Sequence, residues 1–103
     1  MNQRDFDELL TVRLTKIKDV LSTKGTNYSF NNDRLHNFKV AARITGDTPA
    51  KALWGMALKH LVSVEDLVAE RLENNRHNID EKIGDMINYL ILLEALLEDV
   101  REV

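Results

Sequence analysis

The sequence of 103 residues contains no cysteine, a single proline, four glycines and few aromatic residues. The lack of cysteine excludes disulfides and thiolate metal sites, and it suits a reducing compartment. A long hydrophobic run is also missing, because the stretch from Met86 to Leu97 is too short and too polar to cross a bilayer. The first ten residues, MNQRDFDELL, are charged where a signal peptide needs an apolar segment. We therefore expect a cytoplasmic protein with no membrane partner.

Neither sign of charge dominates, since 14 basic and 17 acidic residues give a net charge of −3. A weakly acidic chain of this kind is not attracted to a nucleic-acid polymer or to an anionic membrane surface. The length is that of one domain, residues 1–103, and a domain of this size builds only a modest core on its own.

The scarcity of glycine and proline, together with apolar residues at helical spacing, predicts an all-α fold. We expect four helices in a bundle-like domain, over about residues 4–24, 34–45 and 49–72 and from Asn78 or Asp80 nearly to the C-terminus. Gly25 and Gly46 suit the ends of the first two helices. Asp33 and Thr48 suit N-terminal caps, and Pro49 suits the first turn of the third helix. The short polar break after the third helix predicts antiparallel packing with the fourth, at the centre of the domain.

Two acids and an amide interrupt the apolar final segment. Glu81, Asp85 and Asn88 recur at spacings of four and three, which places them on one stripe of a helix. One interpretation is that the acids favour the helix N-terminus and simply face water. The other is that two carboxylates one turn apart bind a divalent cation such as Mg²⁺, while Asn88 contacts a ligand.

A comparable stripe occupies the third predicted helix, where Lys59, Ser63, Asp66 and Glu70 are spaced by four, three and four. Asp66 and Glu70 are candidates to complete a metal site, and Lys59 is a candidate to neutralise a phosphate. The alternative is a solvated stripe with local pairing. His60 falls on an apolar flank, where a histidine is more often a hydrogen-bonded core residue than a metal ligand.

The stretch NNDRLHNFKVAAR places Asp33, Arg34 and Asn37 on one face at the start of a helix. Arg34 suits a phosphate or a carboxylate, and an open helix N-terminus attracts anions. The alternative is that Asp33 is only a cap and Arg34 only a surface charge. Tyr28 and Phe30, in the preceding loop, either stack on a base or plug the end of the bundle.

Taken together, the segments NYSFNNDRLHNF, ALWGMALKHLVSVEDL and EKIGDMINYLILLEALL resemble the small phage and prophage proteins called nucleotide-modification-associated domains. These proteins are similar to the all-α nucleoside triphosphate pyrophosphatases, the MazG-like and dimeric dUTPase group. The likeness covers about residues 28–97. It implies a helical fold that associates in pairs and binds a nucleotide by way of Mg²⁺. In the pyrophosphatase group, acidic clusters on two helices hold the metal, and water attacks between the α and β phosphates.

On this resemblance, Glu81 and Asp85 correspond to the second acidic motif, although they are spaced by four where the MazG pattern uses three. The first motif, a doubled glutamate followed by a third acid one turn later, has no clean counterpart here. Its nearest equivalents are Glu65, Asp66 and Glu70. The residues expected to contact the nucleotide are Asp33, Arg34, Asn37, Lys59 and Asn88. No catalytic nucleophile stands out, because there is no cysteine and no serine in a recognisable elbow.

Three functions are compatible with these features. The first is a Mg²⁺-dependent nucleoside triphosphate pyrophosphatase, the second a protein that captures a nucleotide without hydrolysing it, and the third a helical adaptor. Because the first acidic motif has no clean counterpart, the sequence supports nucleotide binding more strongly than nucleotide hydrolysis.

The final helix is apolar around much of its circumference. In so small a domain, we expect the other helices to cover only part of this apolar surface. Its apolar residues are Leu90, Ile91, Leu93, Leu96 and Leu97. We therefore expect a homodimer, or a dimer of dimers, with this helix at the contact.

Overall fold

The computed structural model of the chain describes residues 1–23 and 33–101, and all of its regular elements are helical. In chain order they are α1 (Gln3–Lys18), a π-helical turn η1 (Asp19–Thr23), α2 (His36–Thr45), α3 (Pro49–Val68) and α4 (Arg76–Arg101). The prediction of an all-α fold is confirmed for these residues. None of the described helices has the length and apolar composition that a membrane span requires.

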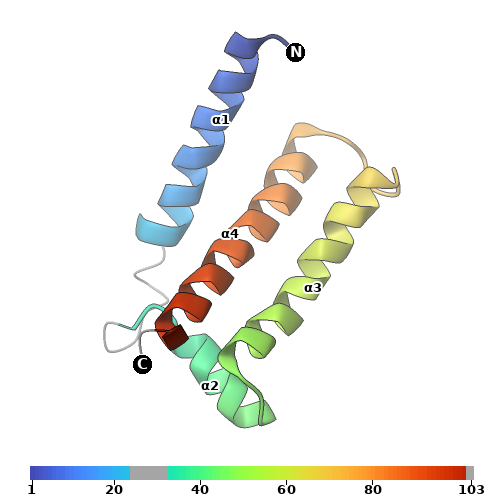
Figure 1. Cartoon of the computed structure of the whole chain (residues 1–103). Helices are drawn as coiled ribbons and strands as arrows, with labels where there is room; N and C mark the ends of the chain where they lie inside the picture. The colour runs from blue at the N-terminus through green and yellow to red at the C-terminus, as the bar shows by residue number, and fades with distance from the viewer. Residues whose placement is uncertain (24–32, 102–103) are drawn as a thin grey trace.

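Helices α3 and α4 form an antiparallel hairpin, as predicted, and the ribbon places it beside α2 at one end (Figure 1). The start of α3 follows the sequence signals. Thr48 is the N-cap, its Oγ1 accepts a hydrogen bond from the backbone N–H of Lys51 at 3.2 Å, and Pro49 occupies the first turn. Both predictions for this helix start are confirmed.

The turn between α3 and α4 differs from the prediction, because α3 ends at Val68 and not near Leu72. Glu70 adopts a left-handed conformation with φ of 62°, which takes the chain out of the helix. The side chain of Arg71 then reaches back to Asp66, with Nε 2.9 Å from Oδ1. This contact, together with the folded-back turn, closes the helix earlier than its apolar pattern indicates.

Helix α4 also begins earlier than predicted. Asn75 accepts a hydrogen bond at Oδ1 from the backbone N–H of Asn78, at 2.8 Å, which caps the helix that starts at Arg76. Asn78 and Asp80, the two predicted caps, therefore lie inside the first turns.

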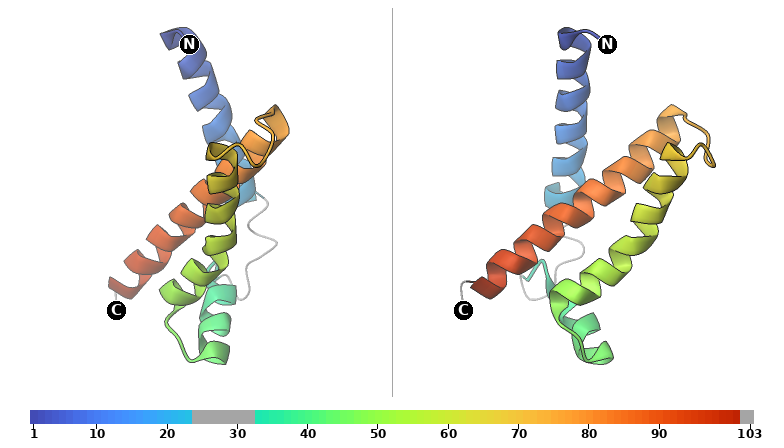
Figure 2. Two further views of the ribbon diagram at one scale, coloured as in Figure 1. Left: turned by 90° about the vertical axis from the view of Figure 1, so that its right-hand side faces the viewer. Right: turned by 45° about the vertical axis from the view of Figure 1, so that its right-hand side comes forward.

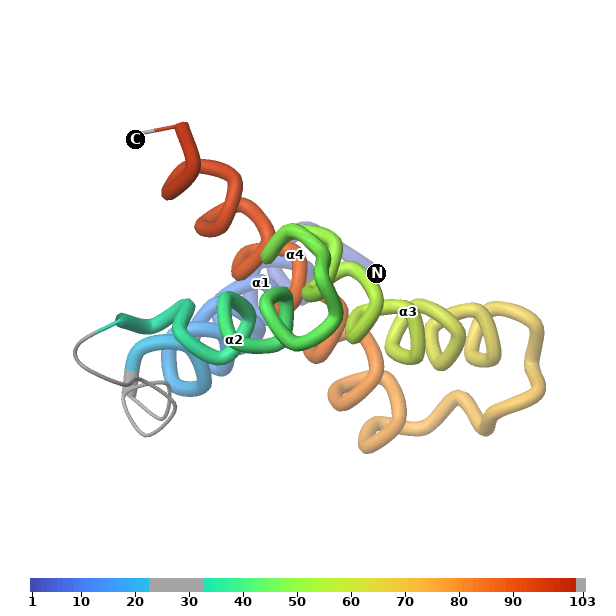
Figure 3. Tube along the Cα trace, turned by 90° about the horizontal axis from the view of Figure 1, so that it is seen from below, coloured from blue at the N-terminus to red at the C-terminus, as the bar shows by residue number. Residues whose placement is uncertain are grey.

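Helix α2 ends as predicted at Gly46, which is the C-cap with φ of 71°. It begins at His36, two residues later than expected. Leu35 is the N-cap of α2, so the prediction of Asp33 as the cap is wrong; Asp33 instead accepts a hydrogen bond at Oδ1 from the backbone N–H of Leu35, at 3.0 Å. In the view from below (Figure 3), α2 lies across the end of the α3–α4 hairpin.

The core is small and sits where α2, α3 and α4 meet. Its central cluster consists of Leu35, Phe38, Leu53 and Leu96, and partly buried residues of α4 pack against it. Leu53 and Leu96 are the largest fully buried side chains. Leu96, which we expected at an interface between copies, is therefore covered within one chain.

Helix α1 adds no buried residue to this core. Figure 2 shows its N-terminal end extending away from the other helices, so α1 packs less closely than the other members of the predicted bundle-like domain. The first helix also changes at Lys18 into the π-helical turn, whereas one helix over about residues 4–24 was expected. Lys24 and Gly25, its predicted last residue and stop, lie outside the described residues.

An ion-pair cluster attaches α1 to α4. Lys16 Nζ lies 2.8 Å and Arg13 Nη2 3.3 Å from Asp80 Oδ1, and Arg13 Nη1 also donates to the Asp80 carbonyl oxygen. The Arg13 side chain crosses α4 at Gly84, where an added Cβ would lie 2.5 Å from Arg13 Nη1. Glycine at this position therefore gives the guanidinium room to reach Asp80.

We predict that Leu53→Ala lowers the free energy of unfolding by about 2–5 kcal/mol, because the substitution leaves a cavity at the centre of a small core. Urea denaturation monitored by circular dichroism measures this loss. Ile44→Ala, on the exposed face of α2, is the matched control and changes the stability by less than about 0.5 kcal/mol. Equal effects of the two substitutions contradict the location of the core.

We predict that Asp80→Asn loosens α1 without unfolding α3 and α4. The hydrogen bond from Lys16 holds the pKa of Asp80 below its ordinary value, so the ionised carboxylate stabilises the docked helix above that ordinary value. This stabilisation disappears as the pH falls through the lowered pKa, and Asp80→Asn has already lost it at neutral pH. Hydrogen exchange checks the prediction, since the α1 amides exchange faster in Asp80→Asn than in the wild type or the surface control Glu73→Gln. Unchanged α1 protection contradicts it.

Candidate functional site

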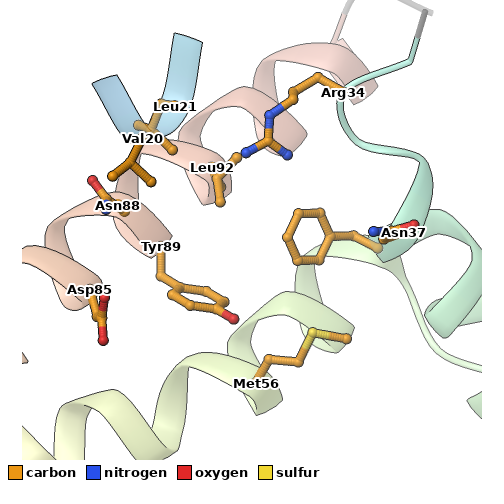
Figure 4. Close-up of a pocket in the computed structure, with 10 residues that line it drawn as sticks. Val20, Leu21, Arg34, Asn37, Met56, Asp85, Asn88, Tyr89 and Leu92 are labelled. Carbon is orange, nitrogen blue, oxygen red and sulfur yellow. The ribbon is translucent and has the colours of Figure 1, made fainter. Parts of the chain in front are cut away.

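A cavity of about 320 Å³ opens where η1, α2, α3 and α4 meet. Its lining residues are Val20, Leu21, Arg34, Asn37, Phe38, Met56, Asp85, Asn88, Tyr89 and Leu92. Figure 4 shows Arg34 and Asn37 entering from the start of α2, opposite Asp85, Asn88 and Tyr89 of α4. Met56 of α3 forms the wall below Tyr89. The cavity thus combines apolar walls with a few polar groups, which is typical of a small-molecule site.

Four of the residues predicted from the sequence meet in this cavity. Arg34 and Asn37 come from one end of α2 and its preceding turn, and Asp85 and Asn88 come from successive turns of α4. They are about 50 residues apart in the chain, and the core cluster between α2 and α4 brings them together.

Two polar atoms in the cavity wall lack a protein partner. Arg34 Nε and Asn88 Oδ1 are buried, and neither forms a hydrogen bond with any of the described residues. A buried polar atom without a partner costs roughly 1–3 kcal/mol, and more when the group is charged. One atom is a donor on a cation and the other is an acceptor, so a ligand with an anionic oxygen and an N–H or O–H group satisfies both.

Behind Asp85 lies a contact that the sequence analysis did not identify. His60 of α3 packs against Tyr89, with ring centroids 4.7 Å apart and planes inclined by 31°. Its Nδ1 lies 3.6 Å from Asp85 Oδ2. His60 is half-buried between α3 and α4, which agrees with its predicted place on the apolar flank of the third helix. The sequence analysis did not pair His60 with Asp85, because the two residues lie on different helices.

Asp33 and Lys59, two further candidates for nucleotide contacts, do not line the cavity. Asp33 pairs with Lys39 at 2.9 Å, and Lys39 also reaches Asp99 of α4 at 3.2 Å. The hydrogen bond from Lys39 lowers the pKa of Asp33. This trio ties the start of α2 to the end of α4, which is a structural role. Lys59 is exposed on α3.

The prediction that Glu70 belongs to an acidic stripe on α3 is wrong. Glu70 lies beyond the end of the helix in a left-handed conformation, so it does not share a helical stripe with Asp66. Asp66 and Glu65 both pair with Arg71, at 2.9 Å and 3.2 Å. These carboxylates stabilise the turn after α3.

Glu81 lies on α4 one turn before Asp85 but outside the lining of the cavity. It pairs with Lys82 at 2.8 Å and with His77 at 3.1 Å, and the hydrogen bond from Lys82 lowers its pKa. Within residues 1–23 and 33–101, no three histidine, aspartate or glutamate side chains converge as a metal site. The four acids proposed as magnesium ligands therefore do not form one cluster in this structure.

The apolar walls were missed by sequence reasoning. Met56, Tyr89 and Leu92 read as ordinary core positions of amphipathic helices, and the described structure leaves them at the rim of an opening. Tyr28 and Phe30, the aromatic residues considered for base stacking, lie outside the described residues.

A second cavity, of about 510 Å³, lies between α1 and the first half of α4. Among its charged residues, Arg13 and Lys16 pair with Asp80, and Glu8 pairs with Arg4. The smaller cavity is the better candidate site because the two buried polar atoms without a partner among the described residues, Arg34 Nε and Asn88 Oδ1, belong to its lining.

Comparisons of this chain with protein-family models, curated proteins and solved structures find no match. The function must be inferred from the geometry.

We predict that Asn88→Leu raises the free energy of unfolding by about 1 kcal/mol, because leucine replaces a buried acceptor that has no partner. Asn78→Leu is the matched control. Asn78 donates from Nδ2 to the Glu73 carbonyl oxygen at 2.9 Å, so its replacement destabilises by a similar amount. Urea denaturation of both variants tests the assignment, and destabilisation by Asn88→Leu contradicts it.

Proposed function

We propose that the protein binds a nucleotide in the cavity between Arg34 and Asn88. The observation that carries this proposal is the pair of buried, unpaired atoms, Arg34 Nε and Asn88 Oδ1, in one cavity. A nucleotide meets both demands, because its phosphates carry anionic oxygens and its sugar and base carry O–H and N–H groups.

Each polar residue then has a role that its chemistry allows. Arg34 donates to a phosphate oxygen, with its positive charge strengthening the hydrogen bond. Asn88 accepts from a sugar hydroxyl or a base N–H group, and Asn37 offers both a donor and an acceptor at the rim. The ring of Tyr89 and the side chain of Met56 supply an apolar surface for the base.

Asp85 is the one carboxylate among the lining residues. Mg²⁺ is commonly held by one or two carboxylates together with substrate phosphates, so Asp85 suits an ion that arrives with the nucleotide. His60 lies next to Asp85, with Nδ1 3.6 Å from Oδ2, and its ring packs in turn against Tyr89.

Capture of the nucleotide is favoured over its hydrolysis. The MazG-like pyrophosphatases, which the sequence resembles, use carboxylates from two helices, and here Asp66 pairs with Arg71 while Glu70 has left the helix. The same resemblance underlies the proposal of a phage or prophage origin. The proposal of a homo-oligomer with α4 at its contact rests on the apolar circumference of this helix. Leu90 and Leu97 of α4 are exposed, which supports that contact.

We predict that Arg34→Gln weakens nucleotide binding by roughly 10- to 100-fold, the loss expected for a charge-assisted hydrogen bond. Isothermal titration with linear and cyclic nucleotides, each with and without Mg²⁺, measures the effect. Arg43→Gln, on the exposed part of α2 and outside the cavity, is the control and binds like the wild type. Asp85→Asn reduces the Mg²⁺-dependent part of the affinity.

The same samples separate the alternative functions. Release of a monophosphate and pyrophosphate with Mg²⁺ selects the hydrolase, and binding without turnover selects capture. If no nucleotide of the panel binds, the proposal is wrong and a helical adaptor remains.

A further inference from the structure

One wall of the candidate cavity comes from a segment outside the core. Val20 and Leu21 of η1 line the cavity together with side chains of α2, α3 and α4 (Figure 4). Neither residue belongs to the central apolar cluster, and η1 continues α1 without a break after Lys18. The position of this wall therefore depends on how α1 is attached to the other helices.

The attachment of α1 is polar and leaves room for movement. Arg13 and Lys16 pair with the Asp80 carboxylate at 3.3 Å and 2.8 Å, whereas α1 contains no buried residue. A cavity of about 510 Å³ lies between the apolar side chains of α1 and those of α4. Because little apolar packing fixes the helix, loss of these ion pairs lets α1 shift or detach at a small cost in free energy.

Only short helical segments connect the ion pairs with the cavity. Lys16 and Val20 are four residues apart, about 6 Å of helix, and Asp80 and Asn88 are eight residues apart, about 12 Å of helix. Both connections are helical throughout. A displacement of α1 is therefore carried to the cavity wall and is not absorbed by a loop.

Displacement of the η1 wall changes what the cavity offers to a nucleotide. Arg34 Nε and Asn88 Oδ1 are buried and have no partner among the described residues. When the wall moves away, water enters and forms hydrogen bonds with these atoms, so a nucleotide gains less by pairing with them. The apolar cover from Val20 and Leu21 is lost in the same step.

We propose that the ion pairs of Arg13 and Lys16 with Asp80 regulate the nucleotide site by holding α1 and η1 in the docked position. Docking of α1 and binding of the nucleotide then stabilise each other, as linkage requires of two coupled sites. Gly84 belongs to this device, because its lack of a side chain leaves room for the Arg13 guanidinium to reach Asp80. This regulation rests on the nucleotide binding proposed above.

Thiol labelling tests the position of the wall without any nucleotide. The chain has no cysteine, so Leu21→Cys places a single thiol in the cavity wall. Adding Asp80→Asn to this variant speeds its reaction with a small thiol reagent about threefold or more, because α1 opens more often. Adding Glu94→Gln, which removes an exposed carboxylate of α4, leaves the rate unchanged. Ile44→Cys, exposed on α2, reacts at the same rate in all three backgrounds.

The neighbouring wall position provides a second measurement. Val20→Cys is expected to follow Leu21→Cys, and circular dichroism identifies any variant that does not fold. Equal labelling rates with and without Asp80→Asn at these positions overturn the proposal.

Calorimetric titration with the four ribonucleoside monophosphates and triphosphates tests the effect on affinity. For each nucleotide that binds the wild type, Asp80→Asn raises the dissociation constant about fivefold, near the low end of measured couplings. Lys16→Gln acts in the same direction and adds little in the Asp80→Asn background, because both changes break the same ion pair. Glu94→Gln binds like the wild type. Equal affinities of Asp80→Asn and the wild type overturn the regulation and leave the proposed binding intact.

Hydrogen exchange gives the reciprocal measurement. A saturating concentration of the same nucleotide slows exchange of the α1 amides in the wild type by about the factor found for the affinity, since the coupling acts equally in both directions. Unchanged α1 exchange at saturation overturns the proposal. If none of the eight nucleotides binds the wild type, the proposed function and its regulation fail together, and the labelling rates alone then decide whether the ion pairs hold the wall.

Discussion

The packing of Leu53 and Leu96 holds together α2, α3 and α4, the three helices that form most of the candidate site. These side chains, from α3 and α4, are the largest completely buried ones among the described residues, and Leu35 and Phe38 bring the start of α2 to the same cluster. Since the cavity walls come from the ends of these helices, the position of each polar group depends on this small apolar contact. A core of this size leaves little surplus stability, so the polar groups around it matter energetically.

Against that background, the buried atoms Arg34 Nε and Asn88 Oδ1 are a net cost to the folded chain. Other charged residues near the core are used differently: Asp33, Lys39 and Asp99 pair with one another and connect the start of α2 to the end of α4. Because one set of polar residues is internally satisfied and the other is not, the structure separates residues that hold the fold from residues with buried atoms that no described residue pairs. Binding sites commonly keep such unsatisfied groups at the expense of stability.

Helix α1 is attached to α4 by ion pairs more than by burial of apolar side chains. Arg13 and Lys16 converge on Asp80, and Gly84 leaves room for the Arg13 side chain. Exposed ion pairs contribute little each and weaken with salt, so this attachment alone does not account for a well-ordered helix with an exposed apolar face. Since η1 follows directly on α1 and contributes Val20 and Leu21 to the cavity, α1 also influences the wall of the site.

The sequence by itself determined the helical class, the antiparallel hairpin of α3 and α4, and the local signals at Gly46, Thr48 and Pro49. These features depend on residue spacing and on backbone preferences within a few residues, which a linear sequence records directly. It also identified Asp85 and Asn88 as candidates, because an acid or an amide in an apolar helix is visible without knowing its neighbours. Arg34 and Asn37 were candidates because they share one face at the start of a predicted helix.

Only the tertiary structure decided which of these candidates meet. The turn at Glu70 removed it from the stripe of Asp66, and the pairing of Asp66 with Arg71 gave that acid a structural role. The contact of His60 with Asp85 joins two helices, and the unpaired state of Arg34 depends on the packing of α2 against α4. Such relations are set by distances between residues far apart in the chain. Periodicity along one helix carries no information about them.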